Sequence, residues 1–97
     1  MRESKGRLLM SWFVYILKCS DGRLYTGVTT DIYQRVKQHK EGQGADFTRL
    51  FGVEELCYSE EFLNKSDAFS RESQIKKWTR KKKLALIAGD KELLKKL

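Results

Sequence analysis

Several residue types that indicate other kinds of protein are scarce or missing from this chain. It contains no proline, two cysteines and one histidine, and no apolar run approaches the roughly 20 residues that a membrane span needs. Cys19 and Cys57 are too few for a disulfide framework or a zinc site, so both are expected to be reduced thiols. The first nine residues, MRESKGRLL, lack the apolar segment of a secretory signal, and a cytoplasmic location is therefore the expectation.

The length and composition predict one small globular domain. With 97 residues, of which 40% are hydrophobic and 34% charged, the chain can bury one modest core and does not have the composition of a disordered protein. No internal repeat or linker-like segment divides it. We expect a flexible tail over residues 1–10 and a single domain over residues 11–97.

Positive charge is concentrated in the final third of the chain. Residues 1–64 contain 9 Lys and Arg against 9 Asp and Glu, whereas residues 65–97 contain 11 against 4 and carry the whole net charge of +7. The run 80–83 (RKKK) is expected to open a helix, where cations oppose the helix dipole. A solvated helical face is one explanation, but a polyanionic partner such as nucleic acid accounts better for this placement. Charge alone does not distinguish DNA from RNA or from an anionic membrane surface.

The strongest local pattern lies between residues 12 and 28. Two apolar segments, 12–18 and 23–28, flank a central Asp-Gly pair, which is a strong hairpin signal. With a three-residue loop over 20–22 and a left-handed Gly22, Leu17 faces Tyr25 and Tyr15 faces Gly27. Opposed residues share a face, so both tyrosines are expected on one side of the sheet, whereas a two-residue turn would separate them.

The remaining segments predict alternation of helices with one more strand. We expect a helix over 31–41, a loop over 42–52, a strand over 53–59, helices over 66–78 and 79–89, and a short amphipathic end piece over 90–97. The fold class is therefore α/β (α+β). It consists of a small three-stranded antiparallel sheet flanked by helices, in the order β-β-α-β-α-α.

Three polar side chains occupy positions that packing alone does not explain. Arg35 and His39 are four residues apart on the first expected helix and therefore project together. Glu72 falls within an expected core stripe, three or four residues from Ala68, Phe69 and Ile75. A carboxylate in that position must be paired, protonated or bound to a cation. Either Arg35 or another base satisfies Glu72, or Glu72 is a functional group.

These features together resemble the GIY-YIG endonuclease superfamily, whose name describes two tripeptides on adjacent strands. Here the tripeptides read Phe13-Val14-Tyr15 and Tyr25-Thr26-Gly27, with Phe13 in place of the leading glycine. The helix arginine of the family matches Arg35 and its later carboxylate matches Glu72. The resemblance spans roughly residues 12–89 and is greatest for the short, stand-alone bacterial members.

The resemblance implies an endonuclease that hydrolyses phosphodiester bonds in DNA, with RNA as an open alternative. In this hypothesis Glu72 holds one divalent ion, Mg²⁺ or Mn²⁺, and Arg35 stabilises the phosphoryl oxygens. Tyr25 positions the phosphate and Gly27 leaves room for the substrate backbone. The implied catalytic residues are Tyr15, Tyr25, Arg35, His39 and Glu72.

The identity of the general base stays open between two residues. Tyr15 is expected to orient or deprotonate the attacking water, but a phenol ionises near pH 10. His39 titrates near neutrality and is an equally good base or proton shuttle on chemical grounds.

Substrate contacts are expected from the loop, the sheet and the basic helices. The residues assigned to them are Gly27, Thr48, Arg49, Lys76, Arg80, Lys81, Lys82 and Lys83. Because so short a chain offers few side chains for reading bases, recognition of DNA structure is expected rather than of sequence. A role in DNA repair or recombination follows from the resemblance, and a partner protein could supply specificity.

Two further functions compete with the nuclease. One is a nucleic-acid-binding module on the same scaffold that does not cleave, which the replacement of the leading glycine by Phe13 favours. The other is an adaptor whose basic helix docks a partner protein. Binding that weakens steeply with salt favours either nucleic-acid function over the adaptor.

Overall fold

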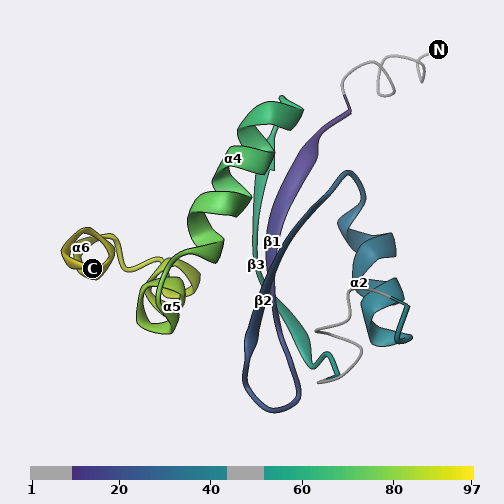
Figure 1. Ribbon diagram of the computed structural model, residues 1–97, viewed down its shortest axis with the longest axis horizontal. Coiled ribbons are helices and arrows are strands. Elements are labelled where there is room, and N and C mark those ends of the chain that lie inside the picture. Colours follow the sequence, from purple (N-terminus) through teal and green to yellow (C-terminus); the bar gives the residue numbers. More distant parts are fainter. Residues whose placement is uncertain (1–9, 44–51) are drawn as a thin grey trace.

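The computed structural model describes residues 10–43 and 52–97 of the chain. Its elements are β1 (Trp12–Lys18), β2 (Leu24–Thr29), α2 (Ile32–Lys40), β3 (Glu55–Phe62), α4 (Lys65–Lys76), α5 (Arg80–Ala88) and α6 (Lys91–Lys96). The three strands form an antiparallel sheet in the order β2-β1-β3. Helix α4 lies on one side of this sheet and α2 on the other (Figure 1). The α+β fold class is confirmed, and the expected end piece is the short helix α6.

The hairpin has the three-residue loop that the sequence predicts. Leu17 pairs with Tyr25 and Tyr15 pairs with Gly27. The backbone amide of Cys19 donates to the carbonyl of Arg23 over 2.7 Å and closes the loop. Gly22 has φ +92°, a left-handed conformation that glycine adopts without steric cost. The two tyrosines therefore emerge on the same face of the sheet.

The central strand β1 is buried on both of its faces. Val14, Tyr15, Ile16 and Leu17 are each at most 1% exposed. Val14 and Ile16 belong to a core cluster with three helical residues, Ala68, Ile75 and Leu86. Fully burying an aliphatic side chain of this size contributes about 1.5–3 kcal/mol, so this layer anchors α4 and α5 to the sheet.

Strand β3 begins later and ends later than the predicted strand over 53–59. Its pairing with β1 continues to the end of both strands, where Trp12 opposes Phe62. Ile16 pairs with Tyr58 and Leu17 with Leu56, so Cys57 is an extra residue in this register. A bulge of this kind interrupts the two-residue alternation from which the strand was predicted. Pairing with β1 then carries the polar residues 60 and 61 into the strand, against their low intrinsic preference for it.

Helix boundaries follow the capping residues that the sequence offers. The side chains of four N-cap residues each accept a hydrogen bond from a backbone amide of the first turn: Asp31, Asn64, Thr79 and Asp90. Gly89 ends α5 in a left-handed conformation. One expectation for α4 is wrong, because Phe69 is 40% exposed whereas Ala68 and Ile75 are fully buried. Phe69 packs at the surface against Trp12, with ring centres 5.7 Å apart.

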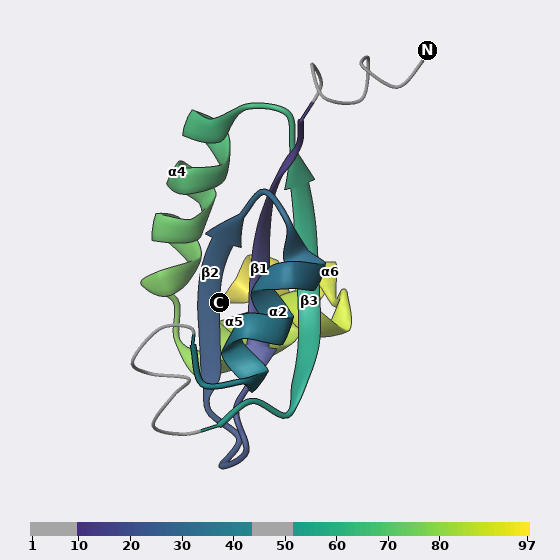
Figure 2. The same cartoon turned by 90° about the vertical axis from the view of Figure 1, so that its right-hand side faces the viewer.

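Figure 2 shows α2 lying over the sheet, with β2 and β3 at its two edges. On the other face, α4 contacts all three strands, and α5 and α6 contact each other. Within residues 10–43 and 52–97, no helix combines the length and apolarity that crossing a membrane requires.

Candidate active site

The hairpin places the Tyr15 ring directly over Gly27. A Cβ atom built on Gly27 would collide with the hydroxyl and with Cζ of Tyr15. The phenol therefore crosses from the central strand over the edge strand β2, and only glycine leaves room for it. The Tyr15 ring occupies the space beside Gly27, and the role of Gly27 in substrate binding stays a prediction.

Helix α2 brings His39 onto this tyrosine. Tyr15 Oη and His39 Nε2 are hydrogen-bonded at 3.0 Å, and the two residues are 1% and 2% exposed. The Tyr25 ring lies 5.2 Å from the His39 ring and 6.3 Å from the Tyr15 ring, measured between centres. Three of the predicted catalytic residues thus form one compact cluster around a buried hydrogen bond.

Burial shifts the pKa values of the two hydrogen-bonded groups in opposite directions. It raises the pKa of Tyr15, as does neighbouring Tyr25, while the positive charge of Arg35 opposes the rise and the charge of Glu72 adds to it. Burial lowers the pKa of His39 below its ordinary value, and Arg35 lowers it further. At neutral pH the pair is therefore a neutral phenol and a neutral imidazole, which suits proton transfer between them.

Arg35 and Glu72 approach this cluster from helices on opposite faces of the sheet. Arg35 is half-buried on α2, where its Nη1 donates to Oε1 of Gln38 over 3.3 Å. Glu72 is on α4 with 14% of its side chain exposed. Both charges act on the Tyr15 hydroxyl, because the phenol reaches over the edge strand that separates the two helices. Tyr15, Tyr25 and His39 are thus in contact with one another, and the charges of Arg35 and Glu72 are close enough to act on the Tyr15 hydroxyl.

Glu72 is paired with Lys76 rather than with Arg35. Lys76 Nζ lies 3.3 Å from Oε2 of Glu72, one helical turn away, and the lysine side chain is 51% exposed. A Glu followed by a Lys four residues later on a helix commonly makes such a pair, so this signal was present in the sequence. Lys76 was predicted to bind substrate, and the structure gives it a carboxylate partner within the site.

The basic run at the start of α5 has several intramolecular contacts. Arg80 Nη1 donates to the carbonyl of Gly22 over 2.7 Å and ties α5 to the hairpin loop. Lys82 Nζ lies 4.5 Å from the ring centre of Trp78. Burial and the charge of Lys76 lower the pKa of Lys83. Lys81 is exposed to solvent. Arg80 thus braces the hairpin loop, and the binding of substrate phosphates by Arg80, Lys81, Lys82 and Lys83 stays a prediction.

Thr48 and Arg49, the two predicted phosphate contacts of the long loop, lie outside the described residues. Within the described ranges, no three His, Cys, Asp or Glu side chains gather into a candidate metal site. Glu72 is the carboxylate of this cluster.

This chain is similar to known proteins over most of its length. The family model described as "GIY-YIG catalytic domain" matches residues 11–85. UPF0213 proteins of Staphylococcus aureus strains Mu3 and N315 are 52% identical over 77 residues, which covers 79% of this chain and 94% of each relative. The solution NMR structure of a UPF0213 protein from Bacillus halodurans has a TM-score of 0.54 and 42% identity to this chain, covering 81% of it and 84% of the other. The matched span contains all five predicted catalytic residues.

Proposed function

Since this chain belongs to the GIY-YIG catalytic-domain family, we propose that it is a divalent-metal-dependent endonuclease that hydrolyses phosphodiester bonds in DNA. The observation that carries the proposal is the buried hydrogen bond between Tyr15 and His39. The charges of one cation and one carboxylate, Arg35 and Glu72, act on the Tyr15 hydroxyl. Nuclease chemistry needs a group that takes the proton of water, a cation on the phosphate and help for the leaving oxygen.

Proton transfer in this proposal passes through Tyr15 to His39. As water attacks phosphorus and the bond to one bridging oxygen breaks, the Tyr15 hydroxyl accepts the proton of the water. It simultaneously gives its own proton to the Nε2 lone pair of His39. No free phenolate has to form, which removes the difficulty posed by the raised pKa of Tyr15. His39 is the final acceptor because its lowered pKa keeps it neutral at pH 7.

Arg35 stabilises the negative charge on the phosphate. Its guanidinium presents a planar fork of donors that matches two phosphoryl oxygens, and it is held on α2 one turn before His39. Tyr25, in contact with His39, offers a hydroxyl to the same phosphate. These two residues orient the phosphorus toward the water that Tyr15 holds.

Glu72 fits a single Mg²⁺ or Mn²⁺ ion. Proteins hold Mg²⁺ through one or two carboxylates, with water and substrate phosphate completing the coordination, so a lone carboxylate suffices. When bound there, the ion would stabilise negative charge on the phosphoryl and leaving oxygens. Lys76 supplies the positive charge that balances Glu72 in the unliganded protein.

We propose further that the enzyme selects DNA by structure rather than by sequence and acts in repair or recombination. The small fold described above offers little surface for reading base edges. Contacts to backbone phosphates do not depend on sequence, and the basic final third is suited to them.

A cleavage panel tests the proposal. Labelled single-stranded, duplex, flap and branched DNA, with a matched RNA strand, are incubated with Mg²⁺, with Mn²⁺ or with chelator. The wild type is compared with Glu72→Ala, and circular substrate is included to detect internal cuts. We expect metal-dependent internal nicks that Glu72→Ala abolishes while the protein stays folded. Full metal-dependent activity in Glu72→Ala would overturn the proposal.

A second candidate function, a module that binds nucleic acid without cutting it, is favoured by the burial of Tyr15 and His39 and by the Lys76 partner of Glu72. Binding that weakens steeply with salt, without cuts in any metal, would support this function instead.

A further inference from the structure

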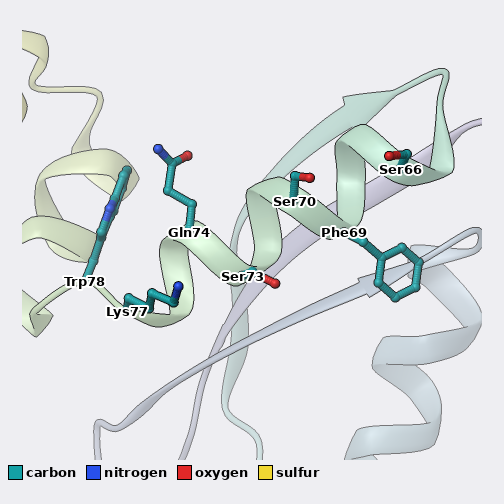
Figure 3. Close-up of a pocket in the computed structure, with 7 residues that line it drawn as sticks. All are labelled: Ser66, Phe69, Ser70, Ser73, Gln74, Lys77 and Trp78. Carbon is teal, nitrogen blue, oxygen red and sulfur yellow. The ribbon is translucent and has the colours of Figure 1, made fainter.

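A long groove follows the outer face of α4, on the side turned away from the sheet. The groove is shallow and open to solvent, with a volume of about 680 Å³. Figure 3 shows that its lining residues run along the whole helix and end at an upright tryptophan. Those residues are Ser66, Phe69, Ser70, Ser73, Gln74, Lys77 and Trp78. Hydroxyl, amide and ammonium groups line its length, and one aromatic ring lies near each end.

At each end of the groove, aromatic and cationic side chains lie close together. At the beginning of α4, Lys65 Nζ lies 5.5 Å from the ring centre of Trp12 and 5.7 Å from that of Phe69. At the other end, Trp78 has Lys82 Nζ at 4.5 Å and the guanidinium carbon of Arg71 at 5.2 Å. Aromatic faces stack with nucleobases and the cations beside them meet phosphates, which is the usual chemistry of single-strand binding.

The spacing of the two ends suits a short stretch of nucleic acid. Phe69 is seven residues before the last residue of α4, which corresponds to about 10 Å along the helix, and Trp78 follows two residues later. That length allows about three steps between stacked nucleotides at a spacing of roughly 3.4 Å. The half-exposed Phe69 ring has free surface for a base, since 40% of the residue is accessible.

The groove adjoins the candidate active site through neighbours on the same helix. Phe69 is three residues before Glu72, and Ser73 is three residues before Lys76. Residues at this spacing are adjacent on a helix surface. A strand that leaves the cluster at Glu72 therefore passes over Phe69 and Ser73 into the groove.

The net charge around the groove favours a polyanion as its ligand. Residues 65–83 contain eight lysines and arginines and two acidic residues, so the helix and the turn after it attract a polyanion and repel a basic peptide. An apolar helix of a partner protein would bury the serines and Lys77 of the groove without hydrogen-bond partners.

We propose that this groove binds a single-stranded segment of the DNA substrate next to the phosphodiester that is cut. The proposal deepens the endonuclease function above and rests on it. Bases stack on Phe69 and Trp78 at the two ends. Serine hydroxyls and Lys77 contact the phosphates between them. Unpaired DNA beside the cut is then the structural feature by which the enzyme selects its substrate.

Equilibrium binding of a fluorescein-labelled oligonucleotide of eight thymidines, with chelator present so that no cleavage occurs, tests the groove. Phe69→Leu removes an exposed groove ring, and Tyr33→Leu is its matched control because Tyr33 is 86% exposed on α2. We expect Phe69→Leu to weaken binding at least about fivefold, the low end for one lost base–ring stack, and Tyr33→Leu to leave it unchanged. Quenching of the two tryptophans, Trp12 and Trp78, is expected on binding.

The salt dependence gives a second readout with its own control. Lys77→Gln should reduce the slope of log affinity against log salt by about 0.7, the value for one phosphate contact on a single strand. Lys95→Gln makes the same charge change on α6, remote from the groove in sequence, and should leave the slope unchanged. Circular dichroism confirms that all four variants are folded.

The outcomes separate the groove from the nuclease. If the groove variants bind the oligonucleotide as their controls do while the wild type cuts DNA with metal, the groove proposal is overturned and the endonuclease proposal stands. If binding is lost only in the groove variants and the wild type makes no cuts with any metal, the groove proposal is supported and the endonuclease proposal is overturned. Equal loss in both members of each pair would also overturn the groove, since binding would then follow net charge or folding.

Discussion

Gly27→Ala tests whether the contact between the hairpin strands sets up the active site. The added methyl group would overlap the Tyr15 hydroxyl and Cζ, so the ring must move and the hydrogen bond to His39 must break. Losing a buried hydrogen bond costs about 1–3 kcal/mol, and overpacking costs a further 1–3 kcal/mol. Since small domains are stable by about 5–15 kcal/mol, the variant should remain folded. If the proton relay is lost, the cleavage rate should fall at least about a hundredfold.

The assay pairs urea denaturation with single-turnover cleavage. Tyr15→Phe is the matched control, because it deletes the hydroxyl and keeps the ring. It should lose as much activity as Gly27→Ala but less of the free energy of unfolding. A Gly27→Ala protein with wild-type stability and wild-type cleavage would refute the reasoning, because Tyr15 would then tolerate displacement without consequence.

Three further predictions follow from single groups. Thr26→Val should raise the free energy of unfolding by about 1 kcal/mol, measured by urea denaturation, because Thr26 Oγ1 is buried without a hydrogen-bond partner among the residues that the structure describes. A destabilised variant would contradict this. Lys76→Gln should tighten Mn²⁺ binding in the absence of DNA about two- to fivefold, measured by calorimetry, because the variant lacks the cation that is paired with Glu72. Unchanged Mn²⁺ affinity would show that Lys76 does not compete with the metal ion for Glu72. His39 should titrate below pH 6.5 by NMR, where its signals are unambiguous because it is the one histidine; a value at or above 6.5 would contradict the neutral acceptor.

The sign of the pH effect follows from the lowered pKa of His39. Between its folded pKa and about pH 6.5, the unfolded chain binds more protons at this site than the folded chain does. The contribution of His39 to stability is therefore fully present above about pH 6.5 and is lost as the pH falls through this window. Cleavage should keep its rate below pH 6.5 for the same reason and decline only when the buried imidazole is protonated.

Much of the scaffold could be predicted from the sequence because local chemistry determines it. The Asp-Gly turn and the pattern around it gave the hairpin register, and with it the shared face of Tyr15 and Tyr25. The helices predicted over 31–41 and 66–78 begin within one residue of α2 and α4. These features depend on neighbours in the chain, where spacing has a direct geometric meaning.

Contacts between distant segments could not be predicted in the same way. The bulge at Cys57 shifted β3 because pairing with β1, rather than local pattern, determines where that strand lies. Arg80 meets the Gly22 carbonyl across 58 residues of sequence. The spacing of Arg35 and His39 predicted that they project together, but the hydrogen bond from His39 to Tyr15 depends on how α2 packs on the sheet.

The measurement that tests the account most directly is a double-mutant cycle on the relay. Single-turnover cleavage of a metal-loaded flap substrate is compared for wild type, Tyr15→Phe, His39→Gln and the double variant, with substrate affinity measured alongside. If the two residues act as one unit, each single variant loses at least about a hundredfold in rate and the double variant loses little more. Losses that multiply, or a single variant that cuts at the wild-type rate, would contradict the relay between Tyr15 and His39.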